Sequence, residues 1–188
     1  TLTAVDSVIV VIDVAKGVEE QTEKLVEVCR MRNIPTIIFI NKLDREGKDA
    51  FDLLDEIEQK LHLKVTPLSL PIGMGYDFKG IFNIWEQNIQ LFSDEQKQTI
   101  GKKLTSNSIS DSKLEKAIGN AHLELLKEEL ELIEAVYPKF NKKAYLDGKL
   151  NPVLFGSALN NFGIQELLNC FIEIAPEPLP KVSEERMV

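Results

Sequence analysis

The sequence predicts an α/β fold, in which helices flank a parallel sheet and an α+β segment is inserted into it. Three apolar segments of strand length, at 7–14, 36–40 and 152–155, are each followed by a segment whose apolar residues have helical spacing. Alternation of strands and helices is typical of parallel α/β sheets. The chain has 188 residues, 44% of them hydrophobic, which is enough for a buried core and an insert.

The first segment, Ser7 to Val14, is a β-branched run typical of a parallel strand that is buried on both faces. Glu19 to Met31 then shows helical spacing, with Leu25 and Cys29 on its apolar side. A second apolar strand follows over Thr36 to Ile40. A strand, a helix and another strand in this order predict a right-handed parallel crossover.

The next segments change in character along the chain. Asp49 to Leu61 predicts an amphipathic helix, whereas residues 65–72 contain two prolines and predict an edge or irregular strand. Gly80 to Trp85 and Asn88 to Phe92 alternate as short strands and predict an antiparallel hairpin. Residues 93–112 are polar and predict no regular element.

Helical spacing returns in the last third of the chain. It predicts a long acidic helix over Lys113 to Tyr137 and a short helix over Asn141 to Leu146. The strand at 152–155 precedes a loop and a helix over Ile164 to Ile174, which a proline-rich segment ends.

These elements predict a division of the chain into two parts. Residues 1–62 and 151–188 are expected to form the parallel sheet, and residues 63–150 an inserted α+β subdomain. The net charge of -8 argues against non-specific binding to a nucleic acid duplex, and no apolar run has the length of a membrane span. Two cysteines far apart in the sequence are interpreted as reduced core thiols, which favours a cytoplasmic protein.

A motif with chemical meaning comes directly after the second strand, as Asn41-Lys42-Leu43-Asp44. Ligands of parallel α/β sheets bind beyond the carboxyl ends of the strands. The carboxylate of Asp44 can accept both N1–H and the N2 amine of guanine, a bidentate match that adenine cannot make. Lys42 can lay its apolar stem over a purine, and Asn41 can tie the loop to nearby backbone.

A second loop, Ser157-Ala158-Leu159, follows the strand at 152–155. The small Ala158 would let its backbone N–H approach the guanine O6, and the Ser157 hydroxyl would hold the carboxylate of Asp44. The alternative is a solvated turn in which Asp44 caps a local amide, or an unrelated doubly wound domain, such as a receiver-type module. The placement of both motifs after core strands favours guanine binding.

At these residues the sequence resembles a known family. NKLD and GSAL resemble the two base-recognition motifs of translational GTPases, and TLTAVDSVIVVIDVAKGVEEQT resembles the segment that follows their D-x-P-G-H motif. The insert with PIGMG and FKGIFNI is similar to the additional subdomain of elongation factor G and its relatives. KLVEVCRMRNIP, NKLDREGKD, LLDEIE and FGSALNNFGI most resemble the bacterial peptide chain release factor 3 family.

The resemblance implies a P-loop GTPase-type sheet that binds GTP or GDP. It implies base recognition by Asn41, Lys42 and Asp44 with Ser157, Ala158 and Leu159, and no ligand role for Asp13. Full-length relatives hydrolyse GTP on the ribosome and promote dissociation of the decoding release factors after termination. The alternatives are a translocase domain like that of elongation factor G, or a ribosome-docking module.

The motifs that bind phosphate and catalyse hydrolysis do not occur in the sequence. Neither G-x-x-x-x-G-K-[ST] nor D-x-P-G-H is found, and both are expected in an upstream part of a longer protein. Catalytic residues and a Mg²⁺ site are expected only there, so this chain alone is expected not to hydrolyse GTP. Strand 7–14 would then have a bare edge, which predicts self-association.

Three further features receive mainly structural interpretations. His62 and His122 lack metal-ligand spacing, and Trp85 is expected in the core of the insert. The acidic helix over residues 113–137 is interpreted as a solvated face, with a contact to the ribosomal stalk as its functional alternative.

Overall fold

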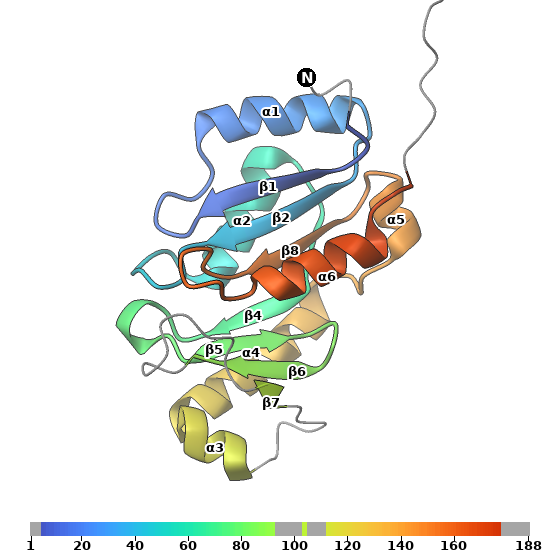
Figure 1. Ribbon diagram of the computed structural model, residues 1–188. Coiled ribbons are helices and arrows are strands. Elements are labelled where there is room, and N and C mark those ends of the chain that lie inside the picture. The colour runs from blue at the N-terminus through green and yellow to red at the C-terminus, as the bar shows by residue number, and fades with distance from the viewer. Residues whose placement is uncertain (1–4, 93–102, 105–111, 178–188) are drawn as a thin grey trace, which may run out of the picture.

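The computed structural model describes residues 5–92, 103–104 and 112–177 of the chain (Figure 1). A parallel sheet has the strand order β1-β2-β8-β3, and an antiparallel sheet has the order β4-β5-β6-β7. The strands of the parallel sheet are β1 (Val8–Asp13), β2 (Thr36–Asn41), β3 (Val65–Pro67) and β8 (Asn151–Phe155). Those of the antiparallel sheet are β4 (Ser69–Ile72), β5 (Gly80–Asn83), β6 (Asn88–Leu91) and β7 (Lys103–Leu104).

Helices cover both faces of the parallel sheet, which confirms the predicted fold class. The helices that the structure describes are α1 (Glu20–Met31), α2 (Ala50–Leu61), α3 (Ser112–Ile118), α4 (Asn120–Val136), α5 (Lys142–Leu146) and α6 (Ile164–Ile174). Side chains of β2 alternate between the faces, as a strand requires. Ile38 and Ile40 pack in one cluster with residues of α2, whereas Ile37 and Phe39 pack in another with residues of α5 and α6.

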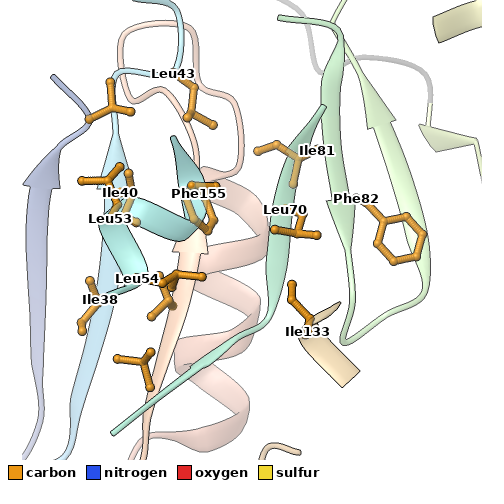
Figure 2. Close-up of a cluster of buried hydrophobic side chains, with 14 of the residues drawn as sticks. Ile38, Ile40, Leu43, Leu53, Leu54, Leu70, Ile81, Phe82, Ile133 and Phe155 are labelled. Atoms are coloured by element: carbon orange, nitrogen blue, oxygen red, sulfur yellow. The ribbon is translucent and has the colours of Figure 1, made fainter. Parts of the chain in front are cut away.

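The first of these clusters continues without a break into the insert. Figure 2 shows Ile38 and Ile40 beside Leu53 and Leu54 of α2, with Leu70 of β4 on the other side of β8. The same cluster includes side chains of β5 and of α4. The parallel sheet and the insert therefore share one hydrophobic core.

Strand β1 differs from the sequence expectation in its burial. The β-branched run at 7–14 predicted a strand covered on both faces, but Val11 is 56% exposed. Among the described strands β1 pairs only with β2, so it forms an edge of the sheet. An edge strand has fewer neighbours than a central one, which accounts for its exposure. In α1 the buried residues are Val26 and Cys29, while Leu25, predicted on the apolar side, is exposed.

The segment at 65–72 is two strands in two different sheets. Pro67 ends β3, which pairs in parallel with β8, and Pro71 lies in β4, which pairs antiparallel with β5. Both strands are at sheet edges, where a missing backbone N–H is tolerated. Residues 65–67, grouped with the insert from the sequence, thus pair with the parallel sheet. The predicted hairpin is confirmed as β5 and β6.

The long helix predicted over Lys113 to Tyr137 is two helices, α3 and α4. Gly119 separates them with a φ of 84°, a conformation that residues with a side chain rarely adopt. Helical spacing continues across this glycine, so periodicity alone did not reveal the break.

Candidate functional site

The pairing of β2 with β8 brings the two predicted loops to one edge of the sheet. Ile40 is the partner of Phe155, so the loops that follow these strands begin side by side. Two backbone hydrogen bonds join them: the Gly156 N–H donates to the Ile40 carbonyl (2.9 Å), and the Leu43 N–H donates to the Gly156 carbonyl (3.2 Å). The Leu43 side chain is fully buried and anchors the first loop in the core.

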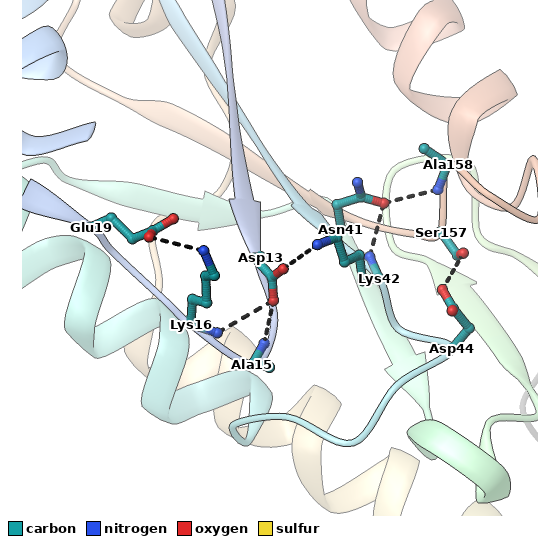
Figure 3. Close-up of polar contacts among 9 residues, drawn as sticks. All are labelled: Asp13, Ala15, Lys16, Glu19, Asn41, Lys42, Asp44, Ser157 and Ala158. Atoms are coloured by element: carbon teal, nitrogen blue, oxygen red, sulfur yellow. Dashed lines mark hydrogen bonds and ion pairs between the residues drawn. The ribbon is translucent and has the colours of Figure 1, made fainter. Parts of the chain in front are cut away.

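Asn41 connects the first loop to the second through its side-chain oxygen. Oδ1 accepts from the N–H of Lys42 at 2.8 Å and from the N–H of Ala158 at 2.9 Å, as Figure 3 shows. Lys42 has a φ of 73°, so the chain turns sharply here. The Ala158 N–H, expected to meet a guanine oxygen, is thus already engaged by Asn41.

Ser157 makes the second connection between the loops. Its hydroxyl donates to Oδ1 of Asp44 (Figure 3). Asn160 Nδ2 donates to the Ser157 Oγ at 3.3 Å. Ser157 is fully buried, whereas Asp44 is half-buried. No described residue donates to the second oxygen of Asp44, so that oxygen can accept from a ligand.

The Lys42 ammonium lies 2.5 Å from Oδ2 of Asp13 at the end of β1 (Figure 3). Oδ1 of Asp13 accepts from the backbone N–H groups of Ala15 and Lys16, at 2.9 and 3.3 Å. The hydrogen bond from Lys42 lowers the pKa of Asp13, and the two amides lower it further against the opposing effect of burial. The sequence predicted no ligand role for Asp13 and no contact between Asp13 and Lys42. The parallel register, which pairs Asp13 with Asn41, is the signal that could have revealed this contact.

The second loop is compact because two glycines permit close approaches. A Cβ at Gly156 would collide with the Phe162 carbonyl and the Phe39 ring. Ser157 and Phe162 exchange two backbone hydrogen bonds of 2.9 Å, which close the loop before α6. Gly163 has a φ of 72° and is the N-cap of α6.

The insert also contacts the first loop, which sequence reasoning missed. The Gly75 N–H donates to the Leu43 carbonyl at 3.0 Å. Gly75 begins a short 3₁₀ turn that ends at Asp77, and Oδ2 of Asp77 lies 2.8 Å from Nε2 of His122 in α4. His122, interpreted as structural, therefore joins α4 to the turn that supports this loop.

The structure places the six predicted base-binding residues in two adjoining loops. It connects Asn41, Ala158, Asp44 and Ser157 by hydrogen bonds, and Lys42 to Asp13. Leu159 lies in the same loop, but its side chain is 79% exposed. The first loop thus carries both a carboxylate that is held by Ser157 and a lysine that is held by Asp13.

Metal ligands are not gathered in the described part of the chain, since no three His, Cys, Asp or Glu side chains there could hold one ion. Within the same residues, no helix is both long enough and apolar enough to cross a membrane.

An open parallel sheet, helices on both faces and a polar loop cluster beyond the strand ends define a ligand-binding α/β domain. The model of the elongation factor Tu GTP binding domain matches residues 1–177, so the chain belongs to that family of GTP-binding domains of translational GTPases. GTP hydrolysis is the general activity of the family. The translational GTPase assignment made from NKLD and GSAL is thus confirmed.

A solved structure shows the same fold. A crystal structure of a protein from Thermus thermophilus has a TM-score of 0.66 to this chain, with 21% sequence identity over 94% of it. The chain spans 27% of that protein's length. At this level of identity the likeness concerns the fold.

Proposed function

We propose that this chain supplies the guanine-reading part of a GTP-binding domain. The observation that carries the proposal is the double connection between the loops, from Asn41 Oδ1 to the Ala158 N–H and from the Ser157 hydroxyl to Asp44. These bonds fix the Asp44 carboxylate relative to the second loop before any ligand arrives. Preorganised acceptors favour a ligand with matching donors.

In this proposal each residue has a separate role. Asp44 accepts from N1–H and the N2 amine of guanine, while Ser157 holds the carboxylate in position. The stem of Lys42 lies against the purine face, and the ion pair with Asp13 keeps that stem extended. Ala158 meets the O6 side of the base through an N–H shared with Asn41, and Leu159 shields the edge of the pocket.

The proposed role of the site is base recognition, and it does not extend to phosphate chemistry. We propose that phosphate binding, Mg²⁺ binding and hydrolysis need segments outside these 188 residues, because the sequence holds no G-x-x-x-x-G-K-[ST] loop. The isolated chain is then expected to release no phosphate from GTP above the buffer level. Phosphate release that Asp44→Ala abolishes would contradict this expectation.

For the whole protein, we propose a cytoplasmic factor that recycles decoding release factors from the ribosome at termination. The support is the resemblance of KLVEVCRMRNIP, NKLDREGKD and FGSALNNFGI to the release factor 3 family. The alternative is a translocase like elongation factor G. With the full-length protein and purified ribosomes, GTP-dependent dissociation of a labelled release factor supports the first role. Movement of messenger RNA without such dissociation supports the second.

We also propose that α3 and α4, which occupy most of residues 113–137, contact the ribosomal stalk. The outer surface of α4 combines exposed Leu125, Leu132 and Val136 with exposed glutamates such as Glu128 and Glu131. Charge reversal at these two glutamates should reduce ribosome-stimulated GTPase activity of the full-length protein. Unchanged stimulation would remove the stalk proposal and leave base recognition untouched.

The test of base recognition is a titration of the isotope-labelled chain with GDP and, separately, with ADP. We expect GDP to shift the backbone NMR signals of Asn41 to Asp44 and Ser157 to Leu159, while ADP shifts them less at equal concentration. Asp44→Asn is the matched variant, because it keeps the size of the side chain and replaces one acceptor oxygen by a donor. Equal responses to GDP and ADP would contradict guanine recognition by these loops.

A further inference from the structure

A second concave site lies where the insert meets the parallel sheet, away from the base-reading loops. It is a cavity of about 440 Å³ between β3, the turn from β5 to β6, and the end of α4. Its walls include three aromatic side chains, Trp85, Tyr137 and Phe140. The rings of Trp85 and Phe140 pack together, with centroids 4.6 Å apart.

The long helix α4 separates this cavity from the base-reading loops. His122, near the start of α4, joins the turn that supports the first loop, whereas Tyr137 of the cavity follows the last residue of α4. At a rise of about 1.5 Å per helical residue, these two positions lie on the order of 20 Å apart. The cavity is therefore a separate site.

Two side chains of opposite charge lie at the cavity. Glu134 and Lys139 line it, and neither forms an ion pair with any residue that the structure describes. Burial, together with the nearby carboxylates of Asp55 and Glu58, raises the pKa of the Tyr137 phenol to about 12. Asp55 and Glu58 thus act on the Tyr137 wall, and Glu134 provides a carboxylate among the lining residues, so a positively charged ligand has a counterion at the site.

We propose that this cavity binds a small organic cation, an ammonium or guanidinium group with apolar substituents. Aromatic faces attract such cations within about 6 Å of the ring centroid, and the attraction is strongest for tryptophan. The apolar walls, which include Pro67 and Pro138, accommodate the substituents, and Glu134 supplies the countercharge. The volume lies within the roughly 300–1,000 Å³ typical of small-molecule pockets.

The chain contains its own reporter for this proposal, because Trp85 is its only tryptophan. The indole Nε1–H therefore gives one NMR signal, which can be followed during titration with choline. The neutral control is 3,3-dimethylbutan-1-ol, which has the shape of choline without its charge. We expect saturable shifts with choline and affinity for the alcohol weaker by roughly tenfold, the effect of about 1.4 kcal/mol of cation–π attraction.

Two exposed residues at the rim provide variants that change the charge in opposite directions. Glu134→Gln should weaken choline binding, and Lys139→Gln should strengthen it, while affinity for the neutral alcohol stays the same in both. N-acetylarginine amide replaces choline in a parallel titration. Tighter binding of this compound identifies a partner's arginine side chain as the natural cation, and tighter binding of choline identifies a free small molecule.

Three outcomes would overturn the proposal. One is an indole signal that neither cation shifts up to its solubility limit. Another is equal affinity for choline and the neutral alcohol, since this would show an apolar pocket without preference for charge. The third is choline binding that neither Glu134→Gln nor Lys139→Gln changes. Because both side chains are exposed, the folded NMR spectrum of each variant can be checked in the same sample.

Discussion

Lys42 and Asp13 form an ion pair between the ends of two neighbouring strands, with Nζ and Oδ2 2.5 Å apart. Asp13 is itself fixed by the N–H groups of Ala15 and Lys16. The proposed base-reading lysine is thus held from β1, on the side of β2 opposite to β8. Both neighbours of β2 contribute to the geometry of the loop that follows it.

Replacement of this aspartate should loosen the loop. Asp13→Asn removes the ion pair, which should lower the free energy of unfolding at pH 7 by about 0.5–1 kcal/mol, since Lys42 is partly exposed. The lowered pKa of Asp13 makes this stabilisation present above the pKa of the unfolded state, and it is lost as the pH falls through the folded value. In urea denaturation, the variant should therefore be less stable than the parent at pH 7. The two free energies of unfolding should become equal at a pH below the folded-state pKa of Asp13. Glu131→Gln, at an exposed site, is the control.

Glu129 in α4 should make stability fall as the pH rises. Burial, with a smaller contribution from the nearby Asp49 carboxylate, raises the pKa of its carboxyl from 4.5 to about 7. Because the folded state binds the proton more tightly than the unfolded state, stability should decline as the pH rises from about 4.5 through 7. Glu129→Gln should remove this decline and make the chain more stable than the parent at pH 8. An unchanged pH profile of the urea midpoint would contradict the prediction.

The break between α3 and α4 depends on the backbone of Gly119. No atom of the described residues lies within 4 Å of a Cβ added there, so the expected cost of Gly119→Ala comes from the positive φ rather than from a collision. We expect a loss of about 1–3 kcal/mol in the free energy of unfolding, measured by urea denaturation. D-alanine at this position, introduced by peptide ligation, prefers positive φ and should restore most of the loss. Equal losses with both forms of alanine would contradict a backbone origin.

The exposed edge of β1 predicts association between copies of this chain. Val11 is 56% exposed on a strand that pairs on one side only among the described strands. Val11→Lys should reduce the fraction of oligomers in sedimentation velocity, because a charged edge resists strand pairing. Leu25→Lys is the matched control, since Leu25 is also exposed but lies on α1. A monomeric parent at high concentration would rule out this association.

Much of the parallel sheet could be predicted from local patterns. In β2, β8 and α6, the residues whose apolar pattern predicted a strand or a helix are also mostly buried. Local pattern was therefore sufficient to predict these elements. The burial of β1 could not be predicted, since its run resembles that of β2 and only the strand order makes it an edge. The break between α3 and α4 at Gly119 was not predicted, because helical periodicity continues on both sides of it.

The sequence could predict those parts of the candidate site that lie in loops directly after the ends of parallel strands. The two loops lie together because β2 and β8 are neighbours, although the sequence does not state that order. Two contacts depend on information that the sequence pattern does not contain. Asp13 meets Lys42 through the register of two strands, and Gly75 meets Leu43 through the fold of the insert. Base recognition by these residues stays a prediction.

The strands β3 and β8 are adjacent and parallel, and this has a consequence for the insert. A chain that leaves β3 at Pro67 must travel back along the sheet before it can enter β8 at Asn151. Such a return takes a dozen or more residues and is usually helical. The insert contains this crossover connection, so part of the insert is required by the parallel pairing of β3 with β8. The antiparallel hairpin could be shortened, but a minimal version of this domain would still need a return helix in its place.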